Sequence, residues 1–253
     1  MLSFSCIFVI YLVVQAITVR RYRVEINILN IKEITDYKSL MDLSRYLDAE
    51  KQERVSKFRR EEDKIRGIIG GVLTNVIASK KTGINMMKIG YEYNQYRKPK
   101  FKNIEELEFN ISHSGDYVIS AFDKECLGVD VEELSAVKEH EDIAKSFFAD
   151  SEYMWIKKQN AESKNRAFYK LWTLKESYVK FLGKGLNIPF DSFAFEYDKE
   201  KDEFYIKDLN ERIRFFNRSL DNYELSACTT SKNIEIIKWN YSKLLEEIDN
   251  VIL

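Results

Sequence analysis

The sequence predicts an α+β fold made of two similar α/β halves, related by a pseudo-twofold axis, with the active site in the cleft between them. The order strand, helix, strand, strand occurs twice along the 253 residues. Each long helix is expected to stop at a glycine, Gly83 in the first half and Gly183 in the second. Clefts between related halves are favoured ligand sites. We expect a first half over residues 24–126 and a second half over residues 127–253.

The elements of the two halves correspond in order. The first half is expected to hold a strand, an acidic turn-and-helix segment, a long helix and two further strands, at 24–29, 46–50, 61–80, 89–93 and 117–122. The second half repeats them at 128–132, 147–152, 164–182, 193–197 and 223–228. Coincidence among short strands is the alternative. The repeat favours a working monomer, because one chain then completes the cleft.

The composition excludes several classes of protein. Charged residues make up 32% and the formal net charge is −1, which is typical of a globular chain and gives no general case for nucleic-acid binding. The three cysteines, Cys6, Cys126 and Cys228, are far apart and have no metal-binding spacing. A disulfide framework is therefore not expected, and a reducing cytoplasm is the predicted location.

The apolar extension over residues 1–23 differs from the rest of the chain. Residues 1–19 carry no charge, and Arg20, Arg21 and Arg23 follow. One interpretation is a membrane anchor whose arginines face the cytoplasm, which is the only membrane contact we expect. The other is that translation starts at the codon of Val24 and that the extension is an artefact. Both interpretations stay open on the sequence.

Residues 109–116 form the first cluster that could carry chemistry, in a polar turn that leads into a strand. Ser112, His113 and the backbone amides of such a turn suit a phosphate oxygen. The alternative is an ordinary polar turn in which the hydrogen-bonding groups of His113 are satisfied within the protein.

The second cluster is the strand 128–132. Asp130 and Glu132 project from the same face, because side chains two apart in a strand point the same way. Two converging carboxylates repel each other unless a cation or a proton intervenes, and oxygen ligands alone favour Mg²⁺. A solvated acidic face on an edge strand is the alternative.

The third cluster lies on the helix 164–182. Trp172, Glu176 and Lys180 are four residues apart and share one face, away from the apolar stripe. The alternative to a functional site is an ordinary surface pair of Glu176 with Lys180. The functional interpretation places Glu176 on a metal ion and Lys180 on a phosphate.

In this order, the strings FNISHSG, GVDVE and WTLKESYVK resemble the three signature motifs of the Sfp-type 4'-phosphopantetheinyl transferases. FFADSEY and GKGLNIPFDSF are also similar to that family, and the resemblance covers roughly residues 24–229. It implies the phosphopantetheinyl transferase fold, with coenzyme A bound between the halves. It further implies that Asp130, Glu132 and Glu176 are Mg²⁺ ligands. Ser112 and His113 match residues that hold the 3'-phosphate region, and Lys180 matches a lysine that contacts the pyrophosphate.

Further positions match basic contacts of the family. Lys51, Arg54 and Arg66 match residues that reach the 3'-phosphate or lie beside it, although solvated basic residues are the alternative. Lys98 and Pro99 belong to a segment similar to the family's Tyr-Gly-Lys-Pro loop beside the adenine. Here Arg97 replaces the glycine, so a side chain stands where the backbone could otherwise approach closely.

The resemblance implies transfer of 4'-phosphopantetheine from coenzyme A to a serine of an apo acyl or peptidyl carrier protein, with release of 3',5'-ADP. The serine proton could pass to Glu176 or Glu152, directly or through water. Residues 151–166 are a candidate docking segment for the carrier. Fatty acid, polyketide and non-ribosomal peptide carriers all remain open, antibiotic biosynthesis included. The competing interpretations are a non-catalytic module that binds coenzyme A or a carrier, and a Mg²⁺-dependent nucleotide phosphohydrolase.

Overall fold

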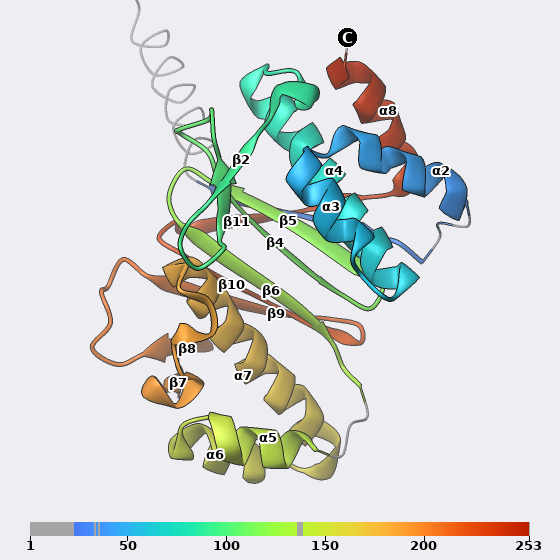
Figure 1. Cartoon of the computed structure of the whole chain (residues 1–253). Helices are drawn as coiled ribbons and strands as arrows, with labels where there is room; N and C mark the ends of the chain where they lie inside the picture. The colour runs from blue at the N-terminus through green and yellow to red at the C-terminus, as the bar shows by residue number, and fades with distance from the viewer. Residues whose placement is uncertain (1–22, 33, 35, 136–138, 253) are drawn as a thin grey trace, which may run out of the picture.

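The computed structural model describes residues 23–32, 34, 36–135 and 139–252, and it contains the same series of elements twice (Figure 1). The first series consists of β1 (Arg23–Asn30), α2 (Tyr37–Asp42), the short 3-10 helix η1 (Leu43–Tyr46), α3 (Ala49–Ser56), α4 (Glu61–Thr82), η2 (Met86–Lys88), β2 (Tyr91–Tyr93), β3 (Pro99–Phe101), β4 (Glu108–Ser114) and β5 (Tyr117–Asp123). The predicted extension lies almost wholly outside the described residues.

The second series starts at once after the first. It consists of β6 (Leu127–Glu133), α5 (His140–Phe147), α6 (Asp150–Lys157), α7 (Ala161–Leu182), η3 (Gly185–Asn187), η4 (Phe190–Ser192), β7 (Phe195–Asp198), β8 (Glu203–Ile206), β9 (Arg214–Leu220) and β10 (Tyr223–Thr229). Each series is a strand, short helices, a long helix, a small hairpin and a longer hairpin. The predicted α+β fold with two similar halves is confirmed.

The two sheets have the same strand order. In the first sheet, β5 lies between β1 and β4; in the second, β10 lies between β6 and β9, with antiparallel pairing throughout these strands. A buried hydroxyl pair joins the long helix to the central strand in both halves. Thr74 Oγ1 lies 2.7 Å from Ser120 Oγ, and Thr173 Oγ1 lies 2.8 Å from Ser226 Oγ. The repetition of this contact supports the pseudo-twofold relation.

The two long helices stop at the predicted glycines, whereas α7 begins at Ala161, earlier than the expected residue 164. Three acidic residues occupy the first turn of α4 and two lysines its last turn, an arrangement that the helix dipole favours. Asn160 caps the start of α7, since its side chain accepts a hydrogen bond from the backbone N–H of Ser163. Both helices stop at a glycine with a positive φ, 73° at Gly83 and 66° at Gly183. Lys180 therefore lies in the last turn of α7.

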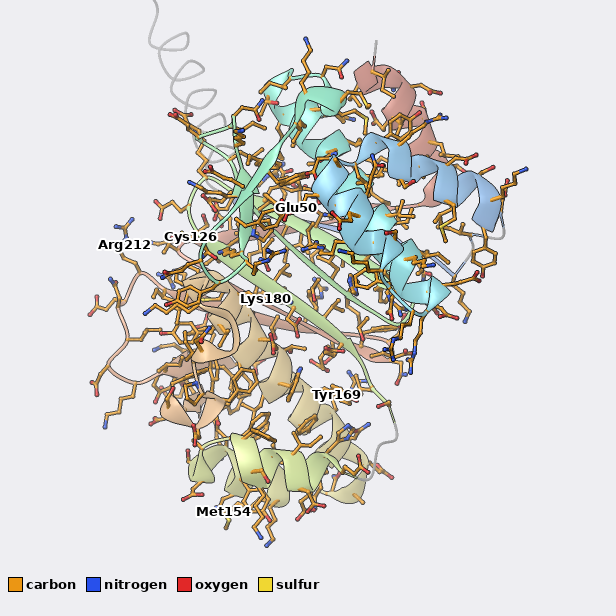
Figure 2. All side chains as sticks on the ribbon, viewed as in Figure 1. Glu50, Cys126, Met154, Tyr169, Lys180 and Arg212 are labelled. Carbon is orange, nitrogen blue, oxygen red and sulfur yellow. The ribbon has the colours of Figure 1, made fainter. Side chains whose placement is uncertain are left out.

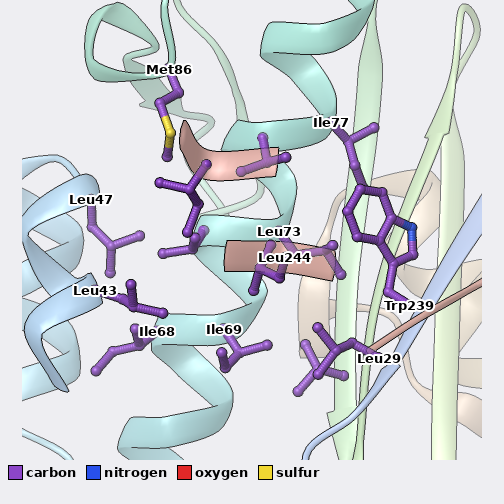
Figure 3. Close-up of a cluster of buried hydrophobic side chains, with 14 of the residues drawn as sticks. Leu29, Leu43, Leu47, Ile68, Ile69, Leu73, Ile77, Met86, Trp239 and Leu244 are labelled. Carbon is purple, nitrogen blue, oxygen red and sulfur yellow. The ribbon is translucent and has the colours of Figure 1, made fainter. Parts of the chain in front are cut away.

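The end of the chain returns to the first half. Strand β11 (Asn233–Trp239) pairs in parallel with β1, and α8 (Tyr241–Ile252) packs beside α4, as Figure 1 shows. The indole N–H of Trp239 donates to Asn27 Oδ1 at 2.8 Å inside the core. Leu244 is fully buried in the cluster that α4 and β1 share (Figure 3). The predicted second half, 127–253, thus contributes a strand and a helix to the first.

Among the residues that the structure describes, no helix is long and apolar enough to cross a membrane. The anchor proposed for residues 1–19 falls outside that part of the chain.

Candidate active site

A pocket of about 430 Å³ opens between the two halves. Helices α3 and α4 and strands β2, β3 and β4 supply its first wall, and β6 and α7 supply its second. The residues that line it and that the sequence singled out are Lys51, Arg54, Arg66, Pro99, Ser112, His113, Asp130, Glu132, Trp172, Glu176 and Lys180. The structure therefore gathers residues from six separate elements or loops at one place. A larger cavity of about 650 Å³, over residues 201–234, contains none of them.

Close approach of α7 to β6 places the second wall. A Cβ atom added at Gly128 would come 2.0 Å from the carbonyl oxygen of Ser177 and 2.4 Å from the backbone nitrogen of Phe181. Only glycine allows the helix to lie this near the strand. This contact brings Glu176 and Lys180 of the helix beside Asp130 and Glu132 of the strand.

The first wall is cationic. Lys51 is only 6% exposed and, among the described residues, has no carboxylate within salt-bridge distance. Burial, and then the charge of Arg54, lowers the pKa of Lys51 to about 8. A phosphate beside it would reverse that shift. Gly71 on α4 leaves room for the lysine, since a Cβ there would lie 3.0 Å from Lys51 Cε.

Arg66 and His113 continue the first wall. Arg66 donates to the carbonyl oxygen of Gly115 at 2.9 Å and pairs with Asp63 at 2.7 Å, so its guanidinium is held in place. His113 keeps contact with solvent through the pocket. The surrounding protein, and then the charges of Arg66 and Lys180, lowers the pKa of His113. These groups suit an anionic ligand.

The second wall holds the carboxylates. Lys180 Nζ lies 2.7 Å from Asp130 Oδ1, and Figure 2 shows Lys180 between the halves. Burial, and then the charge of Asp130, raises the pKa of Glu132 to about 7 and also raises the pKa of Glu176. One ammonium is thus too little to balance three crowded carboxylates.

A divalent cation fits this donor set. Asp130 Oδ2 is buried and, within the described part of the chain, has no hydrogen-bond partner. Carboxylate oxygens without sulfur or nitrogen ligands suit Mg²⁺. No three or more His, Cys, Asp or Glu side chains of the described residues are already arranged as a finished metal site.

Two of the expected site residues lie outside the pocket lining. Lys98 Nζ donates to the carbonyl oxygens of Leu127 at 3.2 Å and Phe181 at 3.4 Å, and burial lowers its pKa. Next to it, Asn94 donates to the carbonyl oxygen of Gly183 at 2.8 Å. In this structure, the ammonium of Lys98 thus joins β6 to the end of α7.

Glu152 is the other exception. Its carboxylate is completely buried, 2.8 Å from Lys175 Nζ, and it also accepts hydrogen bonds from the backbone N–H groups of Phe195 and Ala149. Both oxygens are occupied and neither reaches the pocket. The expectation that Glu152 could accept the serine proton is therefore not supported by its position.

The sequence did not single out Tyr91, Tyr93, Phe58 and Asn110 as site residues, although they line the pocket. Tyr91 donates to Asn75 Oδ1, and its ring lies 5.5 Å from Lys51 Nζ. Arg97, which has a φ of 69°, lies 5.4 Å from the ring of Tyr93 and 3.5 Å from Glu50. The arginine at position 97 thus places an exposed cation beside Tyr93, which lines the pocket.

Comparisons with known proteins identify the family of the chain. The family model described as "4'-phosphopantetheinyl transferase, N-terminal" matches residues 35–125, and that of the "4'-phosphopantetheinyl transferase superfamily" matches residues 126–234. The chain is 30% identical over 206 residues to 4'-phosphopantetheinyl transferase gsp of Aneurinibacillus migulanus, with 80% of this chain and 85% of that one aligned.

Other relatives match over a shorter stretch. The chain is 38% identical over 152 residues to 4'-phosphopantetheinyl transferase ffp of Bacillus subtilis, which is 60% of this chain and 67% of the relative. It is 36% identical over 149 residues to 4'-phosphopantetheinyl transferase Sfp of Bacillus subtilis, which is 59% of this chain and 66% of the relative. Holo-[acyl-carrier-protein] synthase of Thermotoga maritima aligns with 41% of this chain and 61% of its own, at 21% identity and a TM-score of 0.34, which is too low to support a conclusion.

The fold, together with the two matching family models, defines a transferase built of two related halves with a pocket between them. The chain belongs to the Sfp-type 4'-phosphopantetheinyl transferase family. The predicted family and enzyme class are confirmed.

Proposed function

We propose that this enzyme transfers the 4'-phosphopantetheine arm of coenzyme A to a serine of an apo acyl or peptidyl carrier protein. The observation that carries the proposal is the division of the pocket into a cationic wall and a carboxylate wall. Coenzyme A has a 3'-phosphate at one end and a pyrophosphate further along. The first would lie beside Lys51, Arg54, Arg66 and His113, and the second beside Lys180 and the carboxylates.

Asp130, Glu132 and Glu176 would hold Mg²⁺, in line with the buried unpartnered oxygen of Asp130 and the raised pKa values of the two glutamates. When bound, the ion would balance the negative charge that develops on the pyrophosphate oxygens.

In the reaction, the carrier serine oxygen forms a bond to the β-phosphorus of coenzyme A. The bond from that phosphorus to the bridging oxygen breaks, and 3',5'-ADP leaves with the electron pair. Lys180 lies at the second wall and would stabilise the leaving pyrophosphate oxygen. Glu176 lines the same wall and is the candidate acceptor of the serine proton. Because a bound cation would lower the basicity of this carboxylate, the proton would pass through a water molecule if Glu176 also holds the ion.

The test is the intact mass of an apo carrier protein after incubation with the enzyme, coenzyme A and magnesium. We expect a gain equal to one phosphopantetheine, which EDTA and Glu176→Ala both abolish. Coenzyme A that binds without any mass gain on several carrier classes would contradict transfer and favour a binding module. Release of 3',5'-ADP without a carrier would instead indicate a hydrolase.

Replacing His113 with alanine should raise the KM for coenzyme A about 10-fold or more, because one charge-assisted contact to the 3'-phosphate is lost. The kcat for transfer should change little. Steady-state kinetics with coenzyme A and with 3'-dephospho-coenzyme A checks this, since the penalty should disappear with the second substrate. An unchanged KM for coenzyme A would contradict the 3'-phosphate role.

The carrier would dock along residues 151–166. Met154 is 47% exposed there, on the outer side of α6 (Figure 2), and Lys157 and Lys158 are exposed beside it. Exposed lysines would steer an acidic carrier. Because both walls of the pocket come from one chain, we propose a working monomer. The free thiols of Cys126 and Cys228 suit the cytoplasm.

A further inference from the structure

The strands that face each other across the two halves, β4 and β6, are edge strands of separate sheets. Within the described residues, no backbone ladder joins them. Backbone N–H groups along the edge of β6 would remain without partners unless β4 satisfies them in another way.

Side chains of β4 satisfy these groups at every second residue. Asn110 Oδ1 accepts from the N–H of Val129 at 2.9 Å. Ser112 Oγ accepts from the N–H of Val131 at 3.3 Å, and Ser114 Oγ accepts from the N–H of Glu133 at 3.1 Å. The two-residue period of one strand thus matches that of the other.

The two serines make a second contact that the asparagine does not make. Ser112 donates its hydroxyl proton to Asp130 Oδ1 at 2.8 Å, and Ser114 donates to Glu132 Oε2 at 2.7 Å. Beside Asn110, the corresponding residue of β6 is Gly128, which has no carboxylate. Serine thus occupies the β4 positions that face both a backbone N–H and a carboxylate of β6, because a hydroxyl can accept one hydrogen bond and donate another. Asparagine occupies the position that faces a backbone N–H alone.

Ser112 has no capacity left for a phosphate. It is 7% exposed, its one proton is directed to Asp130, and its oxygen also accepts from Lys180 Nζ at 3.0 Å. The expectation that Ser112 holds the 3'-phosphate region therefore does not agree with its contacts.

We propose that Ser112 and Ser114 are positioning residues that orient the carboxylates of Asp130 and Glu132 across the junction of the halves. Each serine fixes one oxygen of its carboxylate, so that the other oxygen is left for the cation. The first half thereby controls the cation affinity of the second. This inference rests on the cation site of the proposed function.

Electron paramagnetic resonance of Mn²⁺ titrated into the full chain tests the inference without any turnover. Ser112→Ala and Ser114→Ala should each weaken Mn²⁺ binding about 10- to 100-fold, the usual effect of removing a partner of a metal ligand. Ser112→Thr keeps the hydroxyl and should retain most of the affinity. The matched control is Asn110→Ala, which removes the β4–β6 contact that involves no carboxylate. It should lower the melting temperature but not the Mn²⁺ affinity.

Kinetics separates the two possible roles of Ser112. If it positions Asp130, Ser112→Ala should slow transfer by the same factor with coenzyme A and with 3'-dephospho-coenzyme A. A penalty that disappears with the second substrate, with Mn²⁺ affinity unchanged, would overturn the inference. Absence of Mn²⁺ binding to the wild-type chain would also overturn the inference. Mn²⁺ binding without transfer to any carrier would contradict only the proposed function.

Discussion

Replacing Asp130 with alanine should lower the kcat for transfer by about 1,000-fold or more, which corresponds to several kcal/mol of lost stabilisation. Asp130 is the centre of the second wall, since Ser112 and Lys180 both contact its Oδ1 atom and its Oδ2 atom is left for a cation. Its loss would remove a proposed cation ligand and leave Lys180 without its carboxylate partner. Excess magnesium should therefore restore little activity.

Two variants control this experiment. Asp130→Asn keeps the shape of the side chain and should be nearly as inactive, because a neutral amide oxygen is a poor substitute for a carboxylate. Asp123→Ala removes a different buried aspartate, which accepts from Thr229 at 3.0 Å and Ser231 at 2.8 Å outside the pocket. It should lower the melting temperature with little change in kcat. Near wild-type turnover by Asp130→Ala would contradict the assignment of the cation site.

Local signals made much of this fold predictable. The long helices α4 and α7 follow from periodicity and from glycines that can adopt positive φ. The buried strands β1, β5, β6 and β10 carry apolar stretches bounded by turns. Nothing local predicts that β11 pairs with β1, because the two strands are separated by almost the whole chain.

The site divides in the same way. The spacing of Asp130 and Glu132 puts both carboxylates on one face of any strand, so it could be read directly. The contacts of Ser112 could not be predicted from the sequence, because they depend on how two edge strands meet across the halves. The sequence around Lys98 resembles a family loop beside the adenine, which predicts a ligand contact for this residue. In the structure, its ammonium donates to a carbonyl oxygen at the end of α7. Matching alternation in residues 110–114 and 128–132 was the signal that could have revealed the serine contacts.

Glu152 illustrates how a long-range contact decides a residue's role. In the sequence, Glu152 belongs to the segment FFADSEY between the second and third motifs and is one of two candidate proton acceptors. Packing of α6 on α7 instead pairs it with Lys175, and neither side chain is exposed to solvent. Lys175 also donates to the carbonyl oxygens of Phe190 at 2.7 Å and Phe193 at 2.9 Å. The pair thereby joins α6, α7 and the segment that follows α7.

Replacing Lys175 with methionine should lower the free energy of unfolding by about 3–5 kcal/mol, because a buried carboxylate is left without its counter-charge. Two carbonyl oxygens also lose their donor. The double variant Glu152→Gln/Lys175→Met should recover a large part of that loss, since no uncompensated charge then remains in the core. Urea denaturation of the wild type, both single variants and the double variant measures the coupling between the two side chains.

The matched control is Lys57→Met, which breaks the surface pair of Lys57 with Glu53, where the side chains are 70% and 67% exposed. Solvent screens such a pair, so we expect no measurable change in stability. If Lys175→Met is no more destabilising than this control, the buried pair does not hold the second half together. The Glu152→Gln variant also tests catalysis: at a temperature where it is folded, its kcat should stay near that of the wild type. A loss of kcat in a folded Glu152→Gln variant would return this glutamate to the proton transfer, despite its distance from the pocket lining.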